Sequence, residues 1–105
     1  MEETLIGQVS HYYTRICVAA VDLEGSLRAG DIVRIRGKHT DFVQRATSME
    51  IQHQPVLQAE AGQDIGLLVD HRARQGDRVY KLTGPGAEAL LARGAADLWD
   101  RDLEG

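Results

Sequence analysis

The fold is decided by the stretch Ile16–Gly37, which reads Ile-Cys-Val-Ala-Ala-Val-Asp-Leu-Glu-Gly-Ser-Leu-Arg-Ala-Gly-Asp-Ile-Val-Arg-Ile-Arg-Gly. An apolar run, a tight connection and the turn at 27–31 lead into a segment in which apolar and polar residues alternate. A shorter version of this turn recurs at 74–80, again with Gly-Asp before an alternating segment. Glycine gives a sharp turn its backbone freedom, and aspartate can bond the backbone there. The stretch therefore predicts short strands of a small all-β barrel.

Six strand segments separated by turns are expected along the chain. They are Leu5–Tyr13, Ile16–Leu23, Ile32–Arg36, Thr40–Ile51 as two short strands or one bent strand, Ile65–Val69 and Arg78–Leu82. Short strands at this spacing, with glycine-containing turns, are typical of a barrel or a sandwich. Nine apolar side chains are expected to point into one interior: Val9, Ala19, Val21, Val33, Ile35, Ile65, Leu67, Val69 and Val79.

The composition changes at Gly84-Pro85-Gly86, after which apolar residues follow a helical period. We therefore expect a barrel domain over residues 1–83, and a link with a C-terminal amphipathic helix over residues 84–105. The candidate interaction stripe of this helix consists of Leu90, Leu91, Leu98 and Trp99.

The second predicted strand has an unusual outer face. Ile16, Val18 and Ala20 share the face that carries Asp22, so three apolar residues are expected outside the barrel. An exposed apolar patch usually has a cover or a partner. We expect the C-terminal helix to pack intramolecularly on this patch.

Length, charge and cysteine content limit the class of protein. The chain of 105 residues suffices for one domain, and its net charge of −4 gives no overall attraction to nucleic acid or anionic membranes. The single cysteine, Cys17, excludes an internal disulfide and indicates a reducing compartment. The first residues lack the basic region of a signal peptide, and no apolar run could span a bilayer. We expect a cytoplasmic protein without a membrane partner, either a monomer or a weak homo-oligomer.

Several short segments spread over residues 5–82 carry a resemblance to known proteins. They are Gly7-Gln8-Val9, Val18-Ala19-Ala20-Val21, Gly25-Ser26-Leu27-Arg28-Ala29-Gly30-Asp31-Ile32-Val33, Ser48-Met49-Glu50-Ile51, Ala61-Gly62-Gln63-Asp64-Ile65-Gly66-Leu67 and Gly76-Asp77-Arg78-Val79-Tyr80. Together they resemble the second domain of translational GTPases such as elongation factor Tu, and most closely the small translation elongation factor-like proteins. The C-terminal barrel of collagenase-like peptidases is similar. The resemblance implies a Greek-key barrel of six or seven strands with no defined chemistry.

The chain lacks the phosphate-binding loop of a GTPase. That loop needs Gly-x-x-x-x-Gly-Lys-Ser/Thr, whereas Gly37-Lys38 is followed by His39 and preceded at the required distance by Ile32. We expect the protein neither to bind nor to hydrolyse GTP. Calorimetric titration with GTP and magnesium checks this, and micromolar binding would contradict it.

In the translation factors, the position that Asp64 matches carries an asparagine near the amino acid of the bound tRNA. The resemblance therefore makes Asp64 a candidate binding residue. A carboxylate at this position would repel the phosphates of a tRNA end.

Two groups of residues are candidates for a binding surface. His11, Tyr12, Tyr13 and Arg15 could form a stacking platform for bases, or a rim whose aromatics cover one end of the core, which we favour. The second group could meet RNA phosphates or an acidic protein, although an ordinary solvated face is favoured. It comprises Arg34, Arg36, Lys38, Arg45, Arg72 and Arg74.

No catalytic, cofactor or metal site is expected. His11, His39, His53 and His71 do not show the spacing of metal ligands, either among themselves or with Cys17. Cys17 lies within the most apolar predicted strand and is expected to be a buried, inert side chain.

The sequence thus supports two functions from different classes. The favoured one is a non-catalytic, translation-factor-like binding module associated with RNA or the ribosome. The alternative is a structural accessory subunit, or protein-interaction module, of a larger enzyme complex. In either case the protein partner or RNA partner is unknown, and an enzyme is the least favoured reading.

Overall fold

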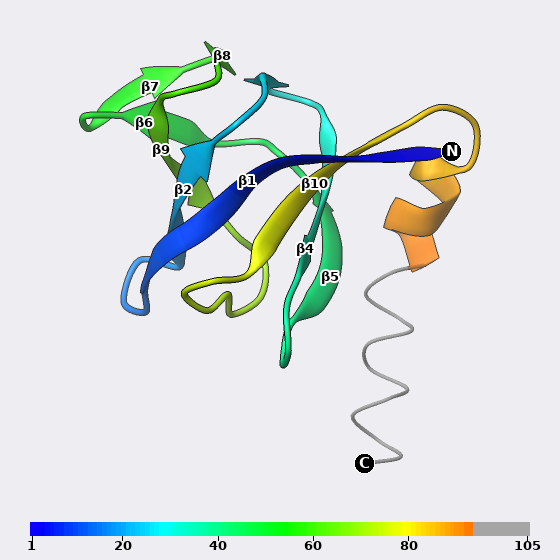
Figure 1. The fold of residues 1–105 in the computed structure, drawn as a ribbon, viewed down its shortest axis with the longest axis horizontal. Coiled ribbons are helices and arrows are strands. Elements are labelled where there is room, and N and C mark those ends of the chain that lie inside the picture. The colour runs from blue at the N-terminus through cyan, green and yellow to red at the C-terminus, as the bar shows by residue number, and fades with distance from the viewer. Residues whose placement is uncertain (94–105) are drawn as a thin grey trace.

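The computed structural model describes residues 1–93, which form ten β-strands and a short helix over residues 87–93 (Figure 1). The strands are β1 Glu2–Tyr13, β2 Val18–Leu23, β3 Leu27–Arg28, β4 Ile32–Arg36, β5 Asp41–Arg45, β6 Met49–Ile51, β7 Gln54–Val56, β8 Gln58–Ala59, β9 Asp64–Leu68 and β10 Arg78–Thr83. The predicted stretch Thr40–Ile51 forms two strands, and the short strands β3, β7 and β8 are additions to the prediction.

Eight strands form one antiparallel sheet in the order β5-β4-β10-β1-β2-β9-β6-β7, and β3 pairs with β8. The crossovers insert β10 between β1 and β4, and β9 between β2 and β6. The sheet curls around a single interior, as Figure 1 shows. The predicted small all-β Greek-key barrel with a C-terminal helix is confirmed.

The interior consists of the side chains that the alternation predicted. All nine predicted core residues are buried, with at most 4% of their surface exposed, and they belong to one cluster. The cluster also contains Ile6, Leu23, Leu27, Phe42, Ala46, Met49, Ala59 and Ala73. The in-and-out pattern of the longer strands therefore identified nine of its members correctly.

The strand β1 bends around the barrel at two irregularities in its register. Its pairing shifts against β10 between Leu5 and Gly7, and against β2 between Val9 and His11. A Cβ atom on Gly7 would lie 2.7 Å from the carbonyl oxygen of Asp22. Glycine at this position therefore allows β2 to pack closely on the bent part of β1.

One turn geometry occurs three times, at 28–31, 60–63 and 74–77. In each turn the fourth residue (Asp31, Gln63 or Asp77) accepts a hydrogen bond on its side-chain oxygen from the first residue's N–H, at 2.7–2.9 Å. Its own N–H donates to the first residue's carbonyl at 3.0–3.2 Å. The third residue is a glycine with φ between 91° and 98°. The Gly-Asp echo in the sequence thus marks a repeated turn, with Gln63 replacing aspartate in the third copy.

A buried glutamine links the two parts of the curled sheet. Gln44 on β5 is 2% exposed. Its Nε2 donates to the carbonyl of Leu68 at 2.8 Å, and its Oε1 accepts from the N–H of Asp70 at 2.7 Å. One side chain therefore satisfies backbone groups at the end of β9, beyond the residues that pair with β6.

The helix packs on a different face from the predicted one. Leu90 and Leu91 contact a small cluster that contains Ile32 and Leu82, with Val43 at its edge. Figure 1 shows this helix on the opposite side of the barrel from β6 and β9. The expected cover for Ile16, Val18 and Ala20 is therefore wrong for residues 87–93, because the outward face of β4, β5 and β10 offers larger aliphatic side chains.

An ion pair fixes the helix to the barrel. Nη2 of Arg45 on β5 donates to both carboxylate oxygens of Glu88, at 2.6 and 2.7 Å. The predicted packing of Leu98 and Trp99 lies outside the described residues.

Cys17 is also placed differently from the prediction. It is exposed and occupies the last position of the turn at 14–17, with φ of 57°. The strand β2 begins one residue later, because Tyr13 pairs with Val18 and four residues are used to reverse the chain. The prediction of a buried cysteine within the strand was therefore wrong.

Candidate functional site

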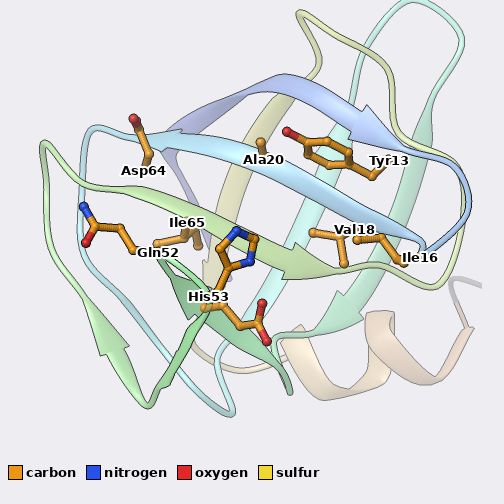
Figure 2. Close-up of a pocket in the computed structure, with 10 residues that line it drawn as sticks. Tyr13, Ile16, Val18, Ala20, Gln52, His53, Asp64 and Ile65 are labelled. Carbon is orange, nitrogen blue, oxygen red and sulfur yellow. The ribbon is translucent and has the colours of Figure 1, made fainter.

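A groove of about 300 Å³ lies on the outer face of β2, β9 and β6 (Figure 2). Its lining comes from the end of β1, the strands β2, β6 and β9, and the β6–β7 turn: Tyr13, Ile16, Val18, Ala20, Glu50, Gln52, His53, Asp64, Ile65 and Gly66. It contains the apolar face of Ile16, Val18 and Ala20 that the sequence singled out.

The floor of the groove follows from the register of the sheet. Ala20 on β2 lies opposite Gly66 on β9, and Gly66 lies opposite Glu50 on β6. The three residues therefore form a row across the strands. Gly66 contributes no side chain, and a Cβ there would lie 3.2 Å from Cγ1 of Val18. The missing side chain leaves a hollow in the middle of an otherwise continuous sheet face.

One end of the groove is apolar. Ile16 is 61% exposed and Tyr13 is 49% exposed, while Leu68, which lies opposite Val18 in the sheet, is 42% exposed. Figure 2 shows Tyr13, Ile16 and Val18 together at this end. Such a cluster of exposed large apolar side chains is typical of a surface with a partner.

The other end is acidic. Asp64 lies opposite Asp22 in the sheet. A hydrogen bond to the Asp64 carboxyl raises the pKa of Asp22 above its ordinary value of 3.8, with smaller contributions from desolvation and from repulsion between the two groups. The two carboxylates therefore resist being charged together.

Replacing Asp22 should change the pH dependence of stability. Because the pKa of Asp22 is raised on folding, its stabilising contribution is present below pH 3.8 and is lost as the pH rises through the folded value. We expect Asp22→Asn to raise the thermal unfolding midpoint at pH 7 and to lose this advantage at pH 3. Thermal unfolding followed by circular dichroism checks this, with the exposed Glu24→Gln as the control for net charge. An equal gain at both pH values would contradict it.

The β6–β7 turn brings two polar side chains to the groove in a strained backbone. Gln52 and His53 have φ of 50° and 65°, as a two-residue hairpin turn of type I′ requires. Glycine and asparagine are the usual residues in such turns, and other residues cost about 1–3 kcal/mol each. Within residues 1–93, Cys17 is the only other non-glycine residue with positive φ, and it follows Ile16 directly. This hairpin was not predicted, because its turn lacks glycine.

The aromatic residues of the predicted stacking platform separate. Tyr12 packs against the barrel core, and burial, followed by the neighbouring Cys17, raises the pKa of its phenol. His11 and Tyr13 point away from the core, with ring centroids 4.5 Å apart in an edge-on arrangement. Arg15 lies exposed in the following turn. Tyr13 therefore joins Asp64 in the groove, whereas Tyr12 belongs to the interior.

The predicted basic residues do not gather into one free patch. Arg34 donates two hydrogen bonds of 2.8 Å to Asp41, which raise the pKa of Arg34, and its Nη1 lies 3.9 Å from Glu3. Arg36 lies 3.7 Å from Glu3 and covers the ring of Tyr80. These acidic partners neutralise charges that were candidates for meeting phosphate, although an ordinary solvated face was favoured.

Of the remaining basic candidates, Arg45 on β5 pairs with Glu88, and the other three lie in loops. Lys38 is exposed in the turn between β4 and β5. Arg72 and Arg74 flank the buried Ala73 in the segment after β9, and Arg74 donates to the carbonyl of His39 at 3.3 Å. None of these residues lines the groove.

Residues 1–93 show neither a metal site nor a membrane-spanning helix. No group of three or more His, Cys, Asp and Glu side chains there could hold a metal ion. No helix in that part of the chain has the length and apolar character needed to cross a membrane.

Comparison with known proteins identifies relatives among the proteases. No family model matches the chain. The chain is 40% identical over 78 residues to an uncharacterised protease of Methanocaldococcus jannaschii. The aligned region covers 73% of this chain and 19% of that protein. The chain is also 30% identical over 83 residues to a collagenase of Porphyromonas gingivalis. Here the aligned region covers 77% of this chain and 23% of that enzyme. The chain thus spans about a fifth of the length of these relatives.

A solved structure with a similar fold also comes from a protein assigned to the peptidases. The C-terminal domain of a Geobacillus thermoleovorans protein assigned to the U32 peptidases superimposes with a TM-score of 0.72 at 19% identity. The match covers 76% of this chain and 93% of that domain. Its selenomethionine variant gives a TM-score of 0.68, with 71% and 95% covered. The chain therefore has the fold of this C-terminal domain.

These findings correct the favoured functional reading. The relatives are proteases and collagenases, so the interpretation as a translation-factor-like, RNA-associated module was wrong. The similarity to the barrel of collagenase-like peptidases is confirmed.

Proposed function

We propose that this chain is a non-catalytic β-barrel that acts as an accessory module of a U32-type peptidase. The observation that carries the proposal is the 40% identity with about a fifth of a protease. The other four fifths of that protein have no counterpart in these 105 residues. The matched barrel is also a separate domain in a solved structure, of which it covers 93%.

The outer surface of the barrel supports an accessory role. The groove joins an exposed apolar end to an acidic end, and it is lined from four strands that the core holds rigidly. A rigid barrel with one shaped surface is suited to holding a polypeptide in place beside a catalytic domain.

Two measurements test the accessory role. The purified chain alone should release no fragments from fluorescently labelled gelatin or casein. The tagged chain, cross-linked in its native cells, should be joined to a polypeptide that matches the remaining four fifths of the protease relatives. The readout is mass spectrometry of the cross-linked band, and an unrelated tagged barrel is the control. Hydrolysis by the chain alone, or cross-linked partners without a peptidase among them, would contradict the proposal.

A reconstitution extends this test. When the chain is added to the purified peptidase partner, the KM for a protein substrate should fall, while cleavage of a short peptide that cannot reach the barrel should stay unchanged. An equal effect on both substrates would instead indicate that the chain activates the catalytic site.

A further inference from the structure

The groove has two chemically different ends at a defined separation. The apolar end contains Ile16 and Val18, and the acidic end contains Asp64 with Asp22 beside it. Val18 and Asp22 are four residues apart on β2, which corresponds to about 13 Å in an extended strand. The middle is the hollow above Gly66, with Glu50 on its far side.

The charges around the groove favour a ligand of positive charge. Glu50 and Asp64 are its acidic lining residues, and Asp22 adds a third carboxylate at the same end. No lysine or arginine of residues 1–93 lines the groove. A cationic group is therefore favoured at the acidic end, and the phosphates of a nucleic acid are repelled.

Neither the described helix nor the charge of the remaining residues favours an occupant from this chain. The helix at 87–93 packs on the cluster of Ile32 and Leu82, on another face. Residues 94–105 carry four acidic side chains and one arginine, so their charge does not complement an acidic groove. A second copy is also disfavoured, because each copy carries a net charge of −4 and two copies therefore repel each other.

We propose that the groove binds an extended peptide segment in which an aliphatic or aromatic side chain is followed two and four residues later by lysine or arginine. In an extended peptide, residues i, i+2 and i+4 point to one side, so all three side chains can face the barrel. The apolar side chain contacts Ile16 and Val18, and the cations reach Glu50 and Asp64. This inference goes beyond the accessory role and rests on the groove alone, so either can fail without the other.

An NMR titration of the full chain tests the inference. The probe is the capped peptide acetyl-Gly-Leu-Ser-Lys-Ser-Lys-Gly-amide. We expect it to shift the amide resonances of Val18, Ala20 and Gly66. Two control peptides, with both lysines replaced by glutamate or with the leucine replaced by serine, should bind at least about tenfold more weakly.

Variants at exposed positions locate the site without disturbing the fold. Ile16→Ser and Asp64→Asn should each weaken binding of the probe about fivefold. The matched controls, Leu57→Ser at a position that is 80% exposed and Glu24→Gln, lie outside the groove and should bind as the unchanged protein does.

Several results would overturn the inference. One is that the glutamate peptide binds as tightly as the lysine probe, and another is that the probe shifts only amide resonances on other faces of the barrel. The inference would also fail if the spectrum were unchanged at about 1 mM peptide, or if the protein self-associated in a way that depends on Ile16. Well-dispersed spectra of both groove variants show that they are folded, so a loss of binding can be assigned to the groove.

Discussion

Replacing Leu67 by alanine should lower the free energy of unfolding by about 2–5 kcal/mol. Leu67 is fully buried on β9, between Ala19 of β2 and Met49 of β6 in the register of the sheet. Truncation removes buried methyl groups and leaves a cavity that three paired strands cannot close. Denaturant unfolding followed by circular dichroism measures the effect.

The adjacent residue provides a matched control. Leu68 has the same side chain on the same strand, but it points outward and is 42% exposed. Leu68→Ala should cost about 1 kcal/mol or less, because little apolar surface returns to water. A loss below about 0.5 kcal/mol for Leu67→Ala would show that Leu67 is not a core residue.

Replacing Gln44 by leucine should lower the free energy of unfolding by about 2–4 kcal/mol. Leucine is similar in size and fits an apolar environment, so the loss arises from hydrogen bonding. Without the side-chain amide, the carbonyl of Leu68 and the N–H of Asp70 lose bonds of 2.8 and 2.7 Å. Backbone groups left unpaired away from water are costly.

Hydrogen exchange separates this mechanism from a general loss of packing. In Gln44→Leu, the Asp70 amide should exchange much faster than expected from the change in global stability. The exposed Gln8→Leu, also on a strand, should change neither quantity appreciably. If the variant were as stable as the unchanged protein, the proposed role of Gln44 in linking β5 to the end of β9 would be wrong.

The groove was only partly predictable from the sequence. Alternation along β2 identified Ile16, Val18 and Ala20 as an outward apolar face, and the groove lies there. Asp64 was selected through the resemblance, and Tyr13 through its aromatic neighbours. Both line the groove, whereas the basic candidates lie elsewhere.

The residues that were missed depend on pairing between distant strands. Glu50 reaches the groove only because β6 pairs with β9, and His53 only because the β6–β7 turn folds beside it. The Gln-His turn has no glycine, so its positive φ values leave no signal in the sequence. Sequence spacing could not place these residues next to β2.

The sequence by itself determined the longer strands, the two Gly-Asp turns and nine residues of the interior, because alternation and turn chemistry depend on residues close together in the chain. Only the tertiary structure decided which outward apolar residues are covered. Ile32 and Ile16 both lie outside the barrel core, yet the helix covers Ile32, while Ile16 stays 61% exposed. The tertiary structure also decided which charged side chains are paired, since Arg34 forms ion pairs with Glu3 and Asp41 from other strands. Covering and pairing are contacts between segments distant in sequence, so local patterns do not encode them.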